Sequence, residues 1–164
     1  MRGGVGHSQP NTCGENTYHH PYGSDYFYAS HGILFSEPCI GRRTHDTLSV
    51  LDLLEDYGYT RLHLAASGLG SLPALFAATL DDRVEQVTLK HCLLSYQELA
   101  EQEDFAWPLS SLLPNALKTL DLPDCYRALG GKHLRVIEPP DARRQPLPGP
   151  AAADRLQALL RASG

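Results

Sequence analysis

Residues 61–80, with the sequence RLHLAASGLGSLPALFAATL, constrain the fold of this chain more than any other stretch. Residues 61–65 predict a short buried strand, whereas apolar residues recur at helical spacing from Leu72 to Leu80. The intervening residues 66–70 are mostly small, so the chain must turn sharply there. A strand, a tight turn and a helix in this order predict one layer of an α/β fold.

The composition fits one domain and excludes two classes of partner. The 164 residues suffice for one domain with a sizeable core. A net charge of -5 gives no electrostatic footprint for nucleic acid or for an anionic membrane. No apolar stretch reaches a membrane-spanning length, and the N-terminal residues contain no apolar signal core. We therefore expect neither nucleic-acid nor membrane binding, and a cytoplasmic location by default.

The cysteines and the paired histidines indicate no metal and no cofactor. The four cysteines are far apart and form no C-x-x-C pair, which predicts isolated reduced thiols. His19 and His20 are adjacent, but no third ligand follows at a suitable spacing. The cysteines are Cys13, Cys39, Cys92 and Cys125.

The first third of the chain predicts a loop and two helices. Residues 1–24 are rich in Gly, Asn, His, Pro and Ser without periodicity, which is typical of a loop or a disordered segment. The domain is therefore expected at residues 25–164. Residues 25–35 predict a short buried helix with Ser24 as its cap, and Pro38 and Gly41 then interrupt the chain.

Residues 44–57 predict an amphipathic helix. Thr44 is a suitable N-cap, and Gly58 is a natural C-cap. Five apolar residues are expected to form its buried stripe. They are Leu48, Val50, Leu51, Leu53 and Leu54.

Two further strands are predicted at residues 84–89 and 133–137, which gives a short parallel sheet of about three strands. Between them, residues 91–131 contain several prolines and short helical pieces, so we expect a lid-like insertion rather than a crossover. Residues 151–162 predict a final helix. Both edges of such a small sheet would be unpaired, which predicts self-association.

Five segments resemble the C-terminal half of the α/β-hydrolase family, and they are closest to bacterial acetyl xylan esterases, dienelactone hydrolases and prolyl oligopeptidase-like proteins. The resemblance implies a partial α/β-hydrolase fold, because a full sheet of this family has about eight strands. It also implies hydrolysis of carboxylic esters, such as acetyl or carbohydrate esters. The segments are GRRTHDTLSVLDLL, AASGLGSLPALFAATLDDRV, LLSY, WPLSSLLPNALKTLDLPDCYRALG and LRVIEPPDA.

The family's nucleophile elbow, G-x-S-x-G between a strand and a helix, has two alignments on residues 66–70. In the favoured alignment Gly68 stands at the nucleophile position, and the backbone N–H of Leu69 belongs to the oxyanion hole. In the other alignment Ser67 is the nucleophile, but Leu69 then occupies a position where strand and helix approach too closely for a branched side chain. The favoured alignment leaves the elbow without a nucleophile.

The remaining triad positions are incomplete. Asp141 follows the third predicted strand, where the family has its catalytic acid, although Pro-Pro-Asp-Ala is equally good turn chemistry. No histidine follows Asp141, although the family order is Ser, acid, His. His63 lies within a strand and is expected to be a core or supporting residue.

Three functional hypotheses follow. The first is a catalytically degenerate hydrolase domain that binds a ligand or has a structural role. The second is an active serine esterase that uses Ser67, Asp141 and a recruited His91 or His133. The third is a phosphate cradle at residues 68–70, which Pro73 disfavours because the dinucleotide fingerprint needs Gly there.

Overall fold

The computed structural model describes residues 23–162. Residues 1–22 of the predicted N-terminal loop, with Cys13 and the His19–His20 pair, lie outside the described residues. The main elements are α1 (Gly23–Leu34), α2 (Cys39–Asp56), β1 (Leu62–Ser67), α3 (Ser71–Leu80), β2 (Val84–Lys90), α4 (Tyr96–Ala100), α5 (Leu122–Ala128), β3 (His133–Ile137) and α6 (Gly149–Ala162). Four short 3-10 turns complete them: η2 (Gly68–Gly70), η3 (Leu109–Ser111), η4 (Ala116–Lys118) and η5 (Leu129–Gly131).

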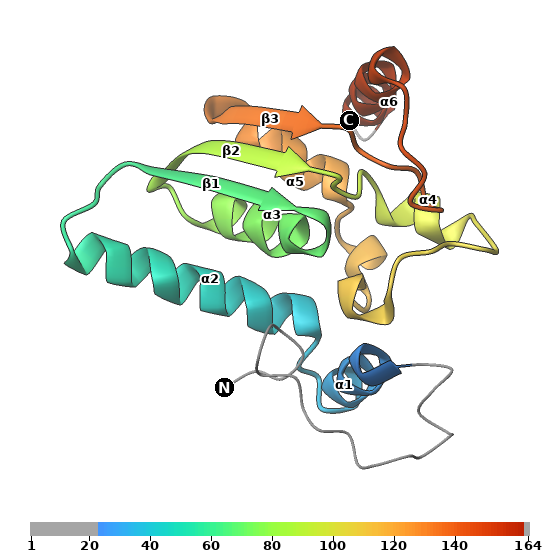
Figure 1. Cartoon of the computed structure of the whole chain (residues 1–164), viewed down its shortest axis with the longest axis horizontal. Helices are drawn as coiled ribbons and strands as arrows, with labels where there is room; N and C mark the ends of the chain where they lie inside the picture. Colours follow the sequence, from blue (N-terminus) through green and yellow to red (C-terminus); the bar gives the residue numbers. More distant parts are fainter. Residues whose placement is uncertain (1–22, 163–164) are drawn as a thin grey trace.

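The three strands form one parallel sheet in the order β1-β2-β3, as Figure 1 shows. This confirms the predicted α/β class with a short parallel sheet flanked by helices. The third strand has the predicted bounds, and the first two each extend beyond the predicted C-terminal residue.

One face of the sheet carries the core. Leu64, Val87 and Leu134 form one row across the three strands, and Ala66, Leu89 and Val136 form the next. Helices α3 and α5 cover this face, and α2 packs against α3 (Figure 1). Fully buried side chains of the helices complete the core, among them Leu72, Leu75, Leu122 and Tyr126.

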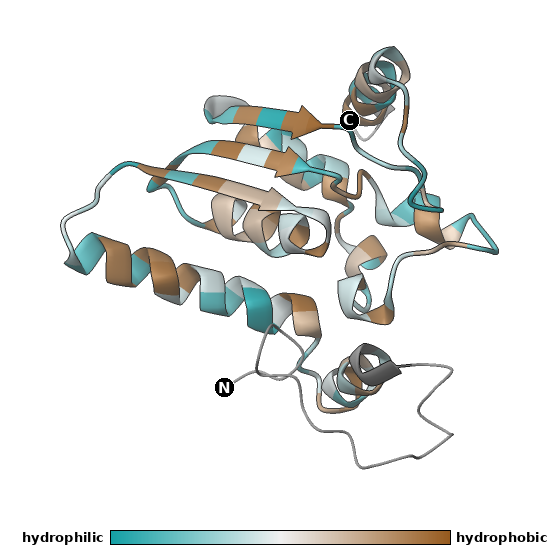
Figure 2. Ribbon diagram, viewed as in Figure 1, coloured by the Kyte–Doolittle hydropathy of each residue, from teal (hydrophilic) through white to brown (hydrophobic). Residues whose placement is uncertain are grey.

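The opposite face of the sheet is polar and accessible, and we call it the open face. Three rows of side chains cross it, and their members are exposed or half-buried. The strands alternate between hydrophobic and hydrophilic residues in Figure 2, as expected for a sheet with one solvated face. The rows are His63, Gln86 and His133; Ala65, Thr88 and Arg135; and Ser67, Lys90 and Ile137.

Helix α1 confirms the helix predicted near residues 25–35, but it is only partly buried. It begins at Gly23, so Ser24 lies inside the helix rather than at its cap. Ala29 is buried, whereas Leu34 and Phe35 are each 77% exposed. The expectation of a buried helix is therefore wrong for its C-terminal end.

Helix α2 begins at Cys39, five residues before the predicted start at Thr44. Pro38 directly precedes the helix, and its fixed φ of -59° suits that position. Gly41 lies inside the helix and does not interrupt it. Val50 and Leu53 are half-exposed, at 53% and 50%, so the predicted stripe is too wide.

The end of α2 agrees with the prediction. Gly58 has a φ of +89°, and its N–H donates to the carbonyl of Glu55. A left-handed glycine just after the last turn is the usual helix C-cap.

The prediction for residues 91–131 needs correction. Helix α5 lies between β2 and β3 in the chain and packs against α3, so it is the crossover helix of this parallel pair. Pro123 does not break the helix, because it stands in the first turn, where its missing N–H has no helical partner. Asp121 and Asp124 form a capping box there. Only residues 91–120, with α4 and two 3-10 turns, lie apart from the crossover.

Two further findings concern the described residues. None of their helices has the length and apolar character needed to cross a bilayer. No cluster of three His, Cys, Asp or Glu residues suited to a metal ion occurs among residues 23–162.

Candidate functional site

The tight bend between β1 and α3 has its apex at Gly68. Ser67 ends the strand with extended backbone angles, φ -135° and ψ 147°, and Gly68 then has a φ of +57°. The hydroxyl of Ser71 donates to the carbonyl of Gly68 at 2.6 Å and fixes the turn from the helix side. The backbone reversal predicted at residues 66–70 is therefore centred on Gly68.

Gly68 leaves the apex without a side chain. A Cβ atom built on Gly68 would have no other atom within 4 Å, so space does not explain the glycine. The left-handed φ does explain it, because residues with a Cβ rarely adopt that conformation. Leu69 follows the apex directly, and its side chain packs against the core.

Ser67 lies on the open face of the sheet rather than at the apex. Its Cα is paired with that of Lys90 on β2, and its side chain is exposed. The Ser67 hydroxyl makes no hydrogen bond to any residue that the structure describes, so no described imidazole is hydrogen-bonded to it.

A charged cluster stands next to Ser67 at the carboxyl ends of the strands. Glu138 Oε2 lies 3.1 Å from Lys90 Nζ and 3.2 Å from His91 Nε2. The pKa of Glu138 is held below its usual range. The hydrogen bond and the positive charge of Lys90 are the largest causes, and the hydrogen bond from His91 is a smaller one. The backbones of His91 and Glu138 are both left-handed, with φ of 51° and 46°. Such strain often accompanies a functional site in a protein.

Sequence reasoning missed Glu138. The signal was present, because Glu138 is the first residue after β3 and the carboxyl ends of parallel strands meet at one edge.

Asp141 is engaged in a turn. Its Oδ1 accepts the backbone N–H groups of Arg143 and Gln145 at 2.9 and 2.8 Å. Its backbone carbonyl accepts the indole N–H of Trp107 at 3.3 Å. These contacts match the turn alternative for Asp141, and no histidine of the described chain is bonded to its carboxylate.

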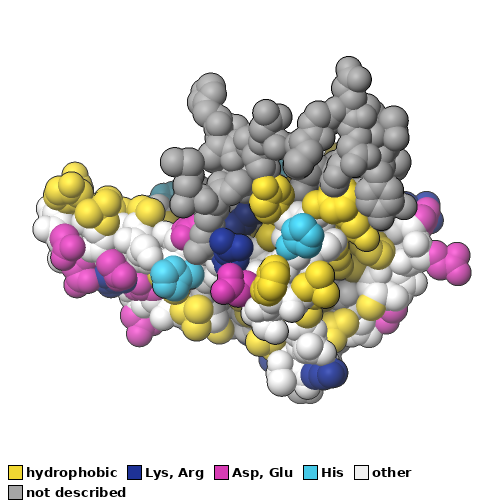
Figure 3. All heavy atoms as spheres, turned by 90° about the horizontal axis from the view of Figure 1, so that it is seen from below, with side chains coloured by type: hydrophobic (Ala, Val, Ile, Leu, Met, Phe, Trp, Pro, Cys, Tyr) yellow, Lys and Arg dark blue, Asp and Glu magenta, His cyan; other side chains and the backbone are white. Residues whose placement is uncertain are grey.

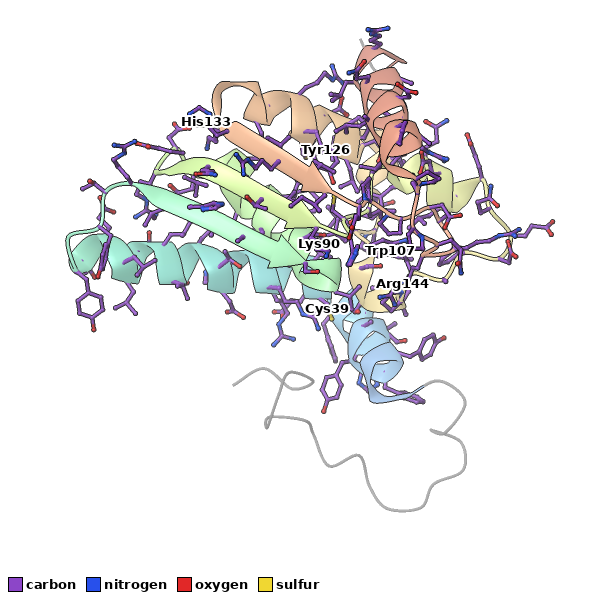
Figure 4. The ribbon with its side chains drawn as sticks, turned by 45° about the horizontal axis from the view of Figure 1, so that its top comes forward. Cys39, Lys90, Trp107, Tyr126, His133 and Arg144 are labelled. Carbon is purple, nitrogen blue, oxygen red and sulfur yellow. The ribbon has the colours of Figure 1, made fainter. Side chains whose placement is uncertain are left out.

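The histidines are distributed over both ends of the sheet. His63 is exposed on the open face, where its Nε2 lies 2.9 Å from Thr88 Oγ1, so the expectation of a core position is wrong. His133 begins β3 and lies at the amino edge of the sheet, whereas Lys90 lies at the carboxyl edge (Figure 4). Of the two histidines considered for recruitment, only His91 shares the edge at which β1 ends.

Comparison of the chain with protein-family models, with curated proteins and with solved structures finds no match. The fold is an α/β domain with a three-stranded parallel sheet flanked by helices.

Proposed function

We propose that this chain is an α/β-hydrolase-like domain that lacks ester hydrolysis and serves as a binding or structural domain. The observation that carries the proposal is the glycine at the apex of the strand-to-helix bend. A hydrolase of this class needs a hydroxyl at that apex, and Gly68 supplies only a hydrogen atom.

The surroundings of Asp141 and Ser67 support the same proposal. The Asp141 carboxylate is used by backbone N–H groups of its own turn. A serine hydroxyl attacks an ester efficiently only when a base within hydrogen-bond reach accepts its proton. Ser67 has no such partner among the described residues.

A serine esterase is the second candidate, and the cluster at Glu138 favours it. In this alternative Ser67 attacks the ester carbonyl, and His91 accepts the hydroxyl proton and gives it to the leaving alcohol. Solvent water, deprotonated by His91, then cleaves the acyl-Ser67 ester, which releases the acid and restores the Ser67 hydroxyl. Glu138 orients the imidazole. The arrangement differs from the predicted one, because Glu138 replaces Asp141 as the acid. Its substrate would be a small carboxylic or carbohydrate ester.

Hydrolysis of p-nitrophenyl acetate distinguishes the two candidates. For a domain without this activity, the full chain and Ser67→Ala release p-nitrophenol at the same rate. Turnover by the full chain that is lost in Ser67→Ala and His91→Ala, and retained in Ser49→Ala, would instead establish the esterase. Ser49 is a suitable control because it is an α2 serine whose hydroxyl bonds to the carbonyl of His45 in its own helix.

A further inference from the structure

A large cavity lies between α1, α4 and the two 3-10 turns η3 and η4. Its volume is about 590 Å³, which falls within the usual range for small-molecule sites. In Figure 1 residues 109–118 lie beside α1, and η3 contacts that helix. Its walls are Ile33, Tyr96, Leu99, Ala100, Phe105, Leu109, Leu112, Leu113, Pro114, Asn115, Ala116, Leu117 and Lys118.

The walls of this cavity are almost entirely apolar. The hydroxyl of Tyr96 is used internally, since it donates to the carbonyl of Ser111 at 2.9 Å. Phe105 and Leu117 are 41% and 50% exposed although they are large and apolar. Figure 3 shows hydrophobic side chains gathered on this side of the molecule. Exposed apolar surface that lines a cavity is typical of a ligand site.

One cation stands among these walls. Lys118 is the only charged residue of the thirteen that line the cavity, and it is exposed. Its ammonium group makes no ion pair or hydrogen bond with any residue that the structure describes. The carboxylate of Asp104, which precedes the cavity residue Phe105 in the chain, is paired with Arg143 at 2.9 Å. Asn115, one helical turn away, adds an amide without a hydrogen bond inside the described chain.

From this chemistry we propose that the cavity binds an aliphatic carboxylate. The hydrocarbon chain lies between Leu99, Leu112 and Leu113, and the carboxylate lies at Lys118. An apolar ligand is selected by the walls, and an anionic end is selected by the unpaired ammonium group. The inference goes beyond the proposed function, because the cavity uses no residue of the β1–α3 bend and its occupancy does not depend on ester hydrolysis.

Fluorescence titration of the full chain with dansyl-labelled undecanoic acid tests the proposal. We expect saturable enhancement of emission at one site per chain. Decanoate should displace the probe at roughly tenfold lower concentration than decyltrimethylammonium, which has the same chain length and the opposite charge. Failure of the probe to bind saturably, or equal displacement by the two competitors, contradicts the proposal.

Two variants locate the site, and one variant controls for net charge. Ala100→Trp fills the cavity from an exposed position of α4 and should abolish saturable binding. Lys118→Glu should weaken decanoate binding roughly tenfold and change decanol binding by less than about twofold. Arg161→Glu makes the same charge change on α6 and should leave both affinities unchanged. Circular dichroism melts of the three variants verify that each is folded.

Other occupants give different results, and each would overturn the proposal. A synthetic peptide of residues 1–22 that displaces the probe more strongly than decanoate assigns the cavity to the chain's own N-terminal segment. A wild-type dimer that becomes monomeric in Ala100→Trp, measured by sedimentation, assigns the cavity to a contact between two copies. Loss of binding in Arg161→Glu equal to that in Lys118→Glu shows that only net charge matters.

Discussion

The Nε atom of Arg83 lies 2.9 Å from Oδ1 and 3.1 Å from Oδ2 of Asp81, whose side chain is buried between α3 and β2. The same guanidinium reaches Asp52 at 2.7 Å and Glu55 at 2.5 Å on α2. One arginine therefore ties α2 to the turn that leads into the central strand.

Replacement of Arg83 by alanine should destabilise the fold, because it removes the guanidinium that neutralises the buried Asp81 carboxylate and leaves only the backbone N–H of residue 83 as a donor within the described chain. We expect the Tm to fall by roughly 5 °C or more, measured by circular dichroism. Arg61→Ala is the matched control, since Arg61 pairs with Glu85 on the surface, where its side chain is 80% exposed. Equal losses in the two variants would show that the Arg83 contacts contribute no more than a surface pair.

The pH dependence of stability should reflect Asp81. Hydrogen bonding to Arg83 is the largest cause that lowers the pKa of Asp81 from its ordinary value of 3.8. A carboxyl whose pKa is lower in the folded state stabilises the fold above the unfolded value, and this contribution is lost as pH falls below it. Urea midpoints measured from about pH 7 to about pH 3 should therefore fall less steeply in Asp81→Asn than in the wild type. If the urea midpoints of the two proteins fall equally with pH, Asp81 does not contribute to the pH dependence of stability.

The cysteines should differ in reactivity. Burial raises the pKa of Cys92, and it raises the pKa of Cys125 to about 11, whereas Cys39 is only half-buried. Because the thiolate is the reactive form, iodoacetamide should label Cys39 roughly tenfold faster than Cys92 and Cys125 in the folded chain. Mass spectrometry of digested peptides resolves the sites. Labelling in urea is the control, and it should remove the difference.

A side chain at Gly68 would meet no steric clash, but the backbone conformation at this position is unfavourable for any residue with a Cβ atom. Gly68→Ala meets no neighbouring atom, yet it forces alanine into a φ of +57°, which costs about 1 kcal/mol of folding free energy. Gly70→Ala is the matched control, because Gly70 also has open space but a φ of -70°. Urea unfolding should show the loss only in Gly68→Ala. If the domain lacks esterase activity as proposed, Gly68→Ser should not create turnover of p-nitrophenyl acetate, because His91, the histidine at this edge of the sheet, is paired with Glu138.

Self-association through the β1 edge is a further expectation. β1 is paired on one side only within the described sheet, and such edges favour contact with another chain. Sedimentation should show association that rises with concentration, and Ala65→Lys on β1 should reduce it. Ala151→Lys on α6 adds the same charge away from the sheet and should have no effect. A monomer at all concentrations would refute the expectation.

The fold class was predictable because the strands are short, carry apolar residues for one buried face, and are separated by clear turns. Residues 133–137 have sharp boundaries, with Gly130 and Gly131 before them and two prolines soon after. The bend at Gly68 was also predictable, because small residues between a strand and a helix permit only a tight turn.

The differences from the sequence predictions arise from helix position and from tertiary contacts, which a local pattern does not contain. Pro38 directly precedes α2 and Pro123 lies in the first turn of α5, although the sequence alone suggested interruptions. Val50 and Leu53 face solvent, because only part of the circumference of α2 contacts α3. The pairing of His91 with Glu138 joins residues far apart in the chain, and no local pattern records such a contact.

The strand order β1-β2-β3 follows the order of the chain, so each strand pairs only with the strand made just before or just after it. During synthesis on the ribosome, β2 can therefore dock on β1 as soon as α3 has emerged, and β3 can add when its own crossover helix is complete. No strand has to wait for a distant partner or insert between two that are already joined. A sheet of this topology grows outward in one direction, from β1 towards β3, as the polypeptide lengthens.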